Sequence, residues 1–375
     1  MASFQKRGKT WQYVISNKGK QIRKGGFRTK KEAQIAAAEI EAKLLTGEQL
    51  VFKDINFGDY FELYMNTYKT NIEKVTKRHY LITLKVIREY FPNTPIQKIR
   101  KIDYQNFLND YGKNKAKETI IKVNTHIRSC VREAIDEGII RIDFTRNVNI
   151  TSGIENQNKT PNYLNYQESM KLLKDIYFDQ NKDLVDYLIL LGLVSGLRFG
   201  ELLGLTIDNF DFKNNLLTIN KTRGYNNLQG KGFGKTKNIQ SNRTIAIDKK
   251  TMELFKELFD KKYQDNTSNH ENLVFYIPHS AYKTLANSTS NKALKKKLEK
   301  LGLNTISIHG LRHTHASICI YKGATINYVS ERLGHSNVQT TYTKYLHVLK
   351  EIRKQDDKKV TNTFVDIFSQ NNKDE

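Results

Sequence analysis

The sequence HGLRHTHAS, residues 309–317, places three histidines and one arginine within nine positions. Residues 333–348, LGHSNVQTTYTKYLHV, add two more histidines and two tyrosines. Positions four apart share one face of a helix, so His309 and His313 would lie side by side. Metal ligands, catalytic groups and ordinary helix residues are the three interpretations that the rest of the sequence has to separate.

The composition favours a multidomain protein that binds a polyanion. A chain of 375 residues is too long for one ordinary core, which predicts two or three domains. It carries 62 Lys and Arg against 39 Asp and Glu, a formal net charge of +23, and this favours nucleic acid as the partner. No apolar run reaches the roughly 18 residues that span a bilayer, so no membrane partner is expected. Cys130 and Cys319 lack CxxC spacing, so we expect a reducing cytoplasm and neither disulfides nor a zinc finger.

Residues 1–47 have the pattern of a small basic sheet followed by one helix. WQYVI and QIRKGGF read as strands joined by tight turns. Thr29 and Glu32 form a capping box for a helix that would end at Gly47. The first 31 residues hold ten Lys or Arg and no acid, which predicts a DNA-binding module in preference to a solvated basic tail. The cations expected to contact DNA are Lys6, Arg7, Lys18, Lys20, Arg23, Lys24 and Arg28.

Two further domains are expected. Residues 55–150 carry apolar side chains at 3.6-residue spacing and are predicted to form a helical bundle, and the polar stretch 149–161 reads as a linker. In residues 163–375, NYQESMKLLKDI begins with a capping pair, while NLLTIN and RTIAI read as strands of one antiparallel sheet. The fold class is therefore multidomain α+β: a small three-stranded sheet plus helix, a helical bundle, and a mixed, mainly helical domain with a small antiparallel sheet.

Three motifs of other enzymes fail on spacing. GKGFGKTK contains Gly-Lys-Thr, but a P-loop needs a glycine where Gln229 stands and a helix afterwards. GLVSGLR lacks the order of a nucleophile elbow around Ser195. His309 and His313 have the spacing of zinc ligands without an acidic or cysteine companion, and Arg312 between them would repel a cation. The sequence therefore predicts neither a metal site nor a cofactor.

A DNA phosphodiester is the substrate that suits these residue types. Its non-bridging oxygens gain negative charge in the transition state, where planar guanidiniums and imidazole donors stabilise them. A tyrosine nucleophile would conserve the backbone energy in a phosphotyrosine ester, so that neither ATP nor a metal ion is needed.

SGLRFGELLGL at 195–205, HGLRHTHAS and LGHSNVQTTYTKYLHV resemble, in this order, the three signature boxes of the tyrosine recombinases, in the integrase branch used by phages and integrative or conjugative elements. The resemblance is strongest from 163 to 350. It implies a site-specific DNA integrase with an arm-binding domain (1–47), a core-binding domain (55–150) and a catalytic domain (163–375).

Carried over position by position, the resemblance implies a role for each residue of the three boxes. Arg198 and Arg312 would clamp the scissile phosphate, and His335 would donate a hydrogen bond to it. Glu201 would anchor the site one turn beyond Arg198. His309 would accept a proton at the tyrosine or bind the phosphate.

The nucleophile and the general acid each have two candidates. The family's tyrosine precedes one residue and then His-Val, which favours Tyr345 over Tyr342, and Tyr342 is expected to be a packing aromatic. The family's lysine protonates the departing 5′-oxygen from a β-hairpin, and Lys235 aligns better with it than Lys237, although both stay open. His313 is expected to support the site, and the neighbouring His315 to be structural.

The resemblance also implies partners and competing functions. Double-stranded DNA with core and arm sites, a homotetramer on DNA and a bacterial cytoplasmic location are expected, and an excisionase or a DNA-bending protein is a further candidate partner. Residues 361–368 would dock either on a neighbouring subunit or on the subunit to which they belong. A type IB topoisomerase-like enzyme and a non-catalytic DNA-binding protein are alternatives, which the N-terminal module and the complete set of signature positions disfavour. A metal-dependent nuclease lacks an acidic cluster.

Overall fold

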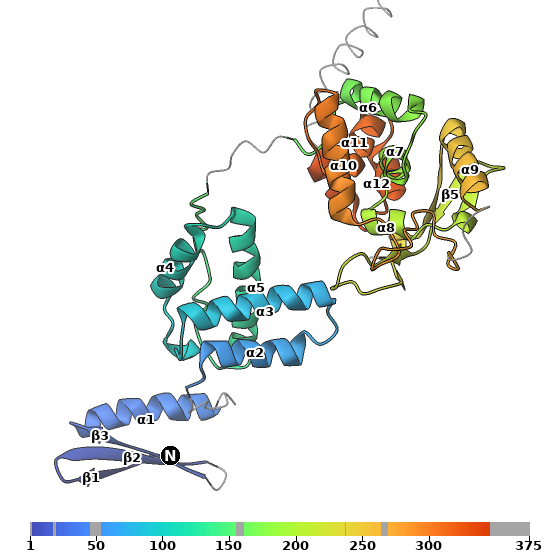
Figure 1. Cartoon of the computed structure of the whole chain (residues 1–375). Helices are drawn as coiled ribbons and strands as arrows, with labels where there is room; N and C mark the ends of the chain where they lie inside the picture. The colour runs from blue at the N-terminus through green and yellow to red at the C-terminus, as the bar shows by residue number, and fades with distance from the viewer. Residues whose placement is uncertain are drawn as a thin grey trace, which may run out of the picture. The chain divides into compact units, whose positions relative to one another are not determined.

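The computed structural model describes residues 2–17, 20–45, 54–154, 161–236, 238–263 and 269–345. The chain divides into two compact units, Met1–Gln157 and Asn158–Glu375, which are coloured blue to green and green to red in Figure 1. None of the described helices combines the length and the apolar character that a membrane span needs.

The N-terminal part of the first unit is an antiparallel sheet with one helix on it. Strands β1 (Ala2–Arg7), β2 (Thr10–Asn17) and β3 (Lys20–Phe27) pair in chain order, and α1 (Lys30–Leu45) follows. Tyr13 and Ile15 lie two positions apart on β2, so they share one face of the strand, and they are buried with Ala37 of α1. Thr29 caps α1 as predicted, by accepting a hydrogen bond from the Glu32 N–H at 3.2 Å, whereas the Glu32 carboxylate bonds the N–H of Arg28 instead of that of Thr29. Gly47 lies outside the described residues.

The rest of the first unit is a bundle of four helices: α2 (Phe57–Tyr68), α3 (Lys74–Tyr90), α4 (Lys101–Gly112) and α5 (Lys117–Asp136), with a 3-10 turn at Ile96–Lys98. The 3.6-residue periodicity is confirmed, because the aromatic residues on α2 at that spacing are all buried. The Phe57 ring packs edge-on against Phe91 and Phe144, and the buried Tyr104 hydroxyl donates to Asn124 Oδ1 at 2.8 Å.

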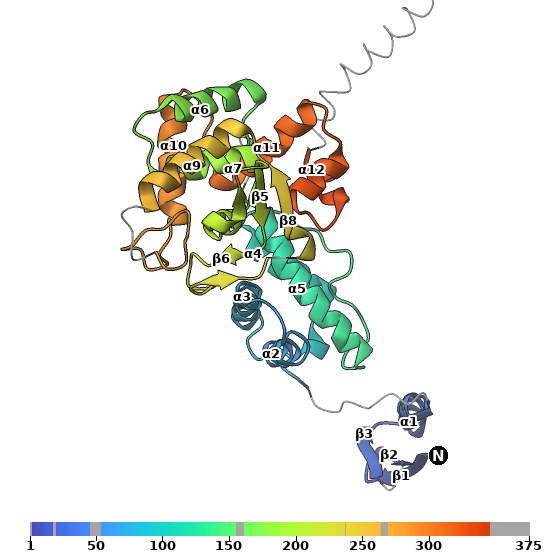
Figure 2. The same ribbon diagram turned by 90° about the vertical axis from the view of Figure 1, so that its right-hand side faces the viewer.

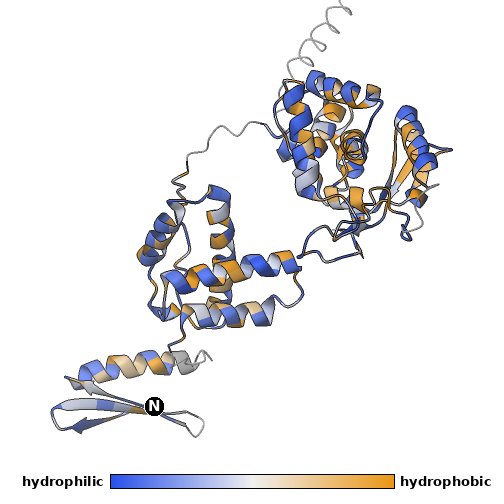
Figure 3. Ribbon diagram, viewed as in Figure 1, coloured by the Kyte–Doolittle hydropathy of each residue, from blue (hydrophilic) through white to orange (hydrophobic). Residues whose placement is uncertain are grey.

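The second unit surrounds one apolar helix with others. Its helices are α6 (Tyr166–Phe178), α7 (Leu184–Ser195), α8 (Phe199–Leu203), α9 (Lys249–Tyr263), α10 (Asn287–Lys300), α11 (Ile308–Tyr321) and α12 (Ile326–Leu333). Figure 3 shows α7 as the most uniformly hydrophobic helix at the centre of this unit, which is the pattern of a helix covered on all sides. Gly192 of α7 allows close packing, because a Cβ there would lie 3.2 Å from Leu311 of α11.

Two small sheets lie beside these helices. Strands β4 (Phe210–Asp211), β5 (Leu216–Ile219) and β8 (Arg243–Ala246) form an antiparallel sheet, with β5 and β8 side by side in Figure 2. This confirms the strands predicted for NLLTIN and RTIAI. Strands β6 (Thr222–Arg223) and β7 (Phe233–Gly234) form a separate hairpin.

Two helices of the second unit end on glycines in the left-handed conformation. Gly196 caps α7 and Gly334 caps α12, each with a φ of 68°. Glycine adopts this conformation without strain, and a Cβ at Gly196 would also lie 2.7 Å from the His315 ring. The last carbonyls of both helices are thus left free of intrahelical partners.

Candidate active site

Arg312 joins the ends of α7 and α12. It lies on α11, whose first turn is capped by Ser307, and it is only 2% exposed. Its Nη1 donates to the Gly196 carbonyl at 2.9 Å and its Nη2 to the Leu333 carbonyl at 2.8 Å. A guanidinium at two helix C-termini meets the negative ends of both helix dipoles. The chain therefore buries a cation where main-chain carbonyls can satisfy it.

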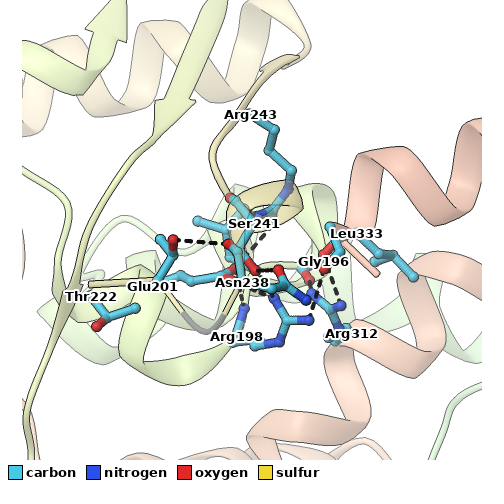
Figure 4. Close-up of polar contacts among 12 residues, drawn as sticks. Gly196, Arg198, Glu201, Thr222, Asn238, Ser241, Arg243, Arg312 and Leu333 are labelled. Atoms are coloured by element: carbon cyan, nitrogen blue, oxygen red, sulfur yellow. Dashed lines mark hydrogen bonds and ion pairs between the residues drawn. The ribbon is translucent and has the colours of Figure 1, made fainter. Parts of the chain in front are cut away.

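Arg198 lies directly beside Arg312. It is the residue before α8, and its Nη2 donates to the Gly334 carbonyl at 3.0 Å, one residue beyond the carbonyl that Arg312 binds. Its Nη1 donates to Glu201 Oε1 at 2.6 Å and to Ser241 Oγ at 3.2 Å. Figure 4 shows the Arg198 and Arg312 side chains next to each other. With 24% of its side chain exposed, Arg198 is open to an incoming ligand.

Glu201 is shared by two arginines. It is 1% exposed, and its second oxygen accepts from Arg243 Nη2 at 3.0 Å. Arg243 also donates to the carbonyls of Arg332, at 2.7 Å, and Ser241, at 2.8 Å. Burial by itself would raise the pKa of Glu201, but the charges of Arg243 and Arg198 outweigh it and hold this pKa below its ordinary value. Glu201 is therefore ionised at neutral pH.

Arg243 is a residue of this site that the sequence analysis missed. It opens strand β8, which gave no local sign that it would reach α8 and the end of α12. In the described part of the chain the guanidiniums of Arg198, Arg243 and Arg312 lie around one carboxylate, that of Glu201, which pairs with the first two. Burial, and then the charge of Arg198, lower the pKa of Arg312 to about 9, so it remains a cation at neutral pH. The surplus positive charge would favour the binding of an anion.

His335 follows the glycine that caps α12. Its Nδ1 lies 2.7 Å from the hydroxyl oxygen of Thr341, a fully buried residue that the sequence analysis also missed. Burial, followed by the charges of Arg312 and Arg198, lowers the pKa of His335 to about 3. The imidazole is therefore neutral at neutral pH, and when Thr341 donates to Nδ1 the proton of the ring lies on Nε2.

Tyr345 is buried in its own subunit. It is 1% exposed and packs with Ala316 and Val329 in a small apolar cluster that α11 and α12 form. Its hydroxyl oxygen lies 3.0 Å from Nδ1 of His313. Burial raises the pKa of Tyr345 to about 12, so the phenol keeps its proton at neutral pH.

Tyr342 does not pack in the interior, and this expectation was wrong. Its side chain is 44% exposed. Residues 338–345 are helical, and the buried stripe of this helix carries Thr341 and Tyr345, four positions apart. Tyr342 lies on the outer side of that stripe.

The other two histidines of the second box differ from each other. His309 is exposed, and its ring stands perpendicular to that of His313 at 4.9 Å between centroids. Burial of part of the ring, then Arg312, lowers the pKa of His309. His315 accepts a hydrogen bond from Arg332 Nε at Nε2 (2.9 Å), so its proton lies on Nδ1, which donates to the Leu193 carbonyl. This neutral His315 holds the end of α7 in place.

The hairpin lysine is not joined to the arginines. Lys235 directly follows β7 and is exposed, and its carbonyl accepts from the Thr222 hydroxyl at 3.1 Å. Its ammonium makes no hydrogen bond or ion pair within the described residues. Lys237 lies outside them. The described residues also contain no group of three His, Cys, Asp or Glu placed to hold a metal ion.

Residues 162–351, about half of the chain, match the model of the phage integrase family. The chain belongs to this family of tyrosine recombinases. Its enzymatic activity is accordingly site-specific DNA recombination. Residues 3–44 match the arm DNA-binding domain, and residues 56–111 match the N-terminal SAM-like domain of phage integrases.

Relatives and solved structures cover most of this recombinase. A tyrosine recombinase XerC-like protein of Caldanaerobacter subterraneus subsp. tengcongensis is 26% identical, over 92% of this chain and 95% of its own. The ICEBs1 integrase of Bacillus subtilis is 25% identical, over 87% and 88%. The Tn1549 transposon integrase in complex with transposon right end DNA superposes with a TM-score of 0.68 at 16% identity, over 80% of this chain and 99% of that one. A lambda integrase dimer bound to a core site gives 0.56 at 16% identity, over 91% and 93%.

The Glu201→Gln variant of this recombinase should lose about 3–5 kcal/mol of unfolding free energy at neutral pH, because two buried guanidiniums lose their shared anion. The pKa of Glu201 is lowered in the folded state, so its contribution is present above its ordinary value of 4.5 and is lost as the pH falls through the lowered value. The difference between wild type and variant should therefore shrink below pH 4.5. Urea unfolding followed by circular dichroism across pH 3–8 measures it.

Glu253→Gln is the matched control, because its ion pair with Lys249 is exposed on α9 and should change stability by less than about 1 kcal/mol. If Glu201→Gln were as stable as this control, the Glu201 carboxylate would not be required to stabilise the buried guanidiniums of Arg198 and Arg243.

Proposed function

We propose that this recombinase cleaves and rejoins DNA strands through a 3′-phosphotyrosine intermediate with Tyr345 as the nucleophile, and that it integrates and excises a mobile element. The observation that carries this proposal is the cluster of three guanidiniums with one carboxylate. Tyr345 of the same subunit contacts His313, the residue next to Arg312 of this cluster. A DNA phosphate would supply the missing negative charge.

The phosphate would bind at Arg198 and Arg312. Both guanidiniums are held by main-chain carbonyls, so their positions are fixed before DNA arrives and little reorganisation is needed as charge develops. The Nε2–H of a neutral His335 would donate a third hydrogen bond. Arg243 donates to Glu201, so it would act by holding Glu201 against Arg198.

The reaction exchanges one phosphate ester for another. The Tyr345 oxygen bonds to phosphorus, the bond from phosphorus to the 5′-oxygen breaks, and a lysine of the hairpin protonates that oxygen. We assign this role to Lys235, whose exposed ammonium is free to meet DNA, with Lys237 as the alternative. The 5′-hydroxyl of a partner strand then attacks the phosphotyrosine and releases Tyr345. Because Tyr345 packs on its own α11 and α12, the attack would occur within one subunit.

DNA partners and assembly belong to the same proposal. The protein would bind double-stranded core and arm sites and form a homotetramer on them, with an excisionase or DNA-bending protein as a further partner. Related integrases of a transposon and of lambda have been solved with DNA, which supports the first part. The expected docking segment at residues 361–368 lies outside the described residues.

The strand register divides the N-terminal cations between two faces. Arg23 is paired with Val14 and Arg7 with Thr10, and these residues alternate with the side chains that α1 covers, so both arginines lie on the open face. Lys6 and Lys24 are paired with residues of the α1 side. The open face would enter the major groove of arm DNA, which accommodates a β-ribbon.

Tyr345→Phe should abolish covalent trapping on a nicked suicide substrate that carries the core site, while Tyr342→Phe, which alters an exposed ring on the same helix, should trap at the wild-type level. Denaturing electrophoresis measures the covalent complex, and EDTA should not reduce it. Trapping by Tyr345→Phe, or loss of trapping in EDTA, would contradict the proposed chemistry.

Replacing Arg7 and Arg23 together by Ala should weaken arm-site binding at least tenfold, since each good contact to DNA contributes about 1–3 kcal/mol. The matched variant with Lys6 and Lys24 replaced should lose less, because these neighbours face the other side of the sheet. Fluorescence anisotropy with arm DNA compares them, and core-site cleavage should be unchanged in both. Equal losses would contradict the assignment of the open face.

A further inference from the structure

His313 contacts the reacting atom of the proposed nucleophile. Its Nδ1 lies 3.0 Å from the hydroxyl oxygen of Tyr345, with the two rings 5.9 Å apart and inclined by 57°. The residue stands next to Arg312 on α11, so it is held at the same place as the phosphate clamp. In the described residues it is the imidazole that is hydrogen-bonded to this hydroxyl.

His309, the residue that the second signature box suggests for proton transfer, is placed differently. It lies one helical turn before His313 and is exposed. Its ring packs perpendicular to the ring of His313, and it is His313 that contacts the Tyr345 hydroxyl. This position suits contact with an incoming phosphate more than contact with a buried phenol. The positions of His309 and His313 therefore suit two separate roles, contact with the phosphate and contact with the tyrosine, which the sequence assigned to His309 alone.

We propose that His313 is the general base of the reaction. Its Nδ1 takes the phenolic proton as the Tyr345 oxygen bonds to phosphorus. It returns this proton to Tyr345 when a 5′-hydroxyl, whose own proton passes to the deprotonated hairpin lysine, displaces the tyrosine. On the side of phosphorus opposite the tyrosine, the bond to the 5′-oxygen breaks, and that oxygen takes a proton from the hairpin lysine. The inference rests on the proposed phosphotyrosine chemistry and adds the residue that makes the nucleophile reactive.

The surroundings of Tyr345 explain why a base is needed. The ring is buried among apolar side chains, and its pKa is raised to about 12, so only about one molecule in 10⁵ would carry tyrosinate at pH 7. A neutral acceptor within hydrogen-bonding distance removes the proton only as the new bond forms. His313 directly follows Arg312 in the sequence and is faced by His309 of its own helix and by Tyr345. Its charge also acts on His335. A bound phosphate would offset the positive charge that His313 gains with the proton.

The test is single-turnover cleavage of the suicide substrate by full-length His313→Asn, which keeps a polar side chain of similar size and cannot accept the proton. We expect the rate at pH 7 to fall by about 10²–10⁴-fold. Between pH 7 and pH 9 the rate should rise about tenfold per unit, because the reactive tyrosinate must then form without help. Binding of uncleaved core DNA should stay within about threefold of wild type.

A substrate with sulfur in place of the bridging 5′-oxygen separates base from acid. A thiolate leaves without a proton, so this substrate should restore cleavage to Lys235→Ala but not to His313→Asn. His313→Asn cleaving within threefold of wild type would overturn the inference. So would a loss that is independent of pH, or one that the sulfur substrate repairs. These outcomes leave the phosphotyrosine chemistry intact, whereas covalent trapping by Tyr345→Phe would remove its basis.

Discussion

The hydrogen bonds between two arginines and the carbonyl ends of two helices are the constraint on which the rest of the second unit depends. Arg312 binds the carbonyl of Gly196, which caps α7, and that of Leu333, which ends α12, and Arg198 binds the carbonyl of Gly334. Each helix can present those carbonyls only because it ends on a left-handed glycine. The same hydrogen bonds thereby satisfy the free carbonyls at the helix ends and fix the positions of Arg198 and Arg312. The glycine after α12 is followed directly by His335.

This arrangement concentrates positive charge that the described residues do not fully neutralise. Glu201 is ionised and shared between Arg198 and Arg243, while Arg312 has only neutral carbonyls as described partners. Burying a cation without an anion is unfavourable, and in this fold the helix dipoles offset part of the cost. A bound phosphate would offset the remainder. The same cations depress the pKa of His335, which keeps the ring neutral and able to donate one hydrogen bond.

Much of the fold, and the order of the three signature boxes that supply the site, follow from local sequence patterns. The cap at Thr29 and the paired strands NLLTIN and RTIAI depend on nearby residues, and the structure contains them. Contacts across long separations could not be predicted in this way. Arg243 meets the carbonyl of a residue 89 positions away. Only the packing of the helical residues 338–345 on α11 and α12 decides that Tyr345 is buried and Tyr342 exposed. For the same reason the contact of His313 with Tyr345 became visible only in the folded chain.

The central claim is that the buried phenol of Tyr345 becomes linked to DNA. Tandem mass spectrometry of the stalled complex, after digestion of protein and DNA, measures this directly. We expect a nucleotide joined through its 3′-phosphate to the oxygen of Tyr345. An adduct on any other residue, or a linkage through a 5′-phosphate, would contradict the account.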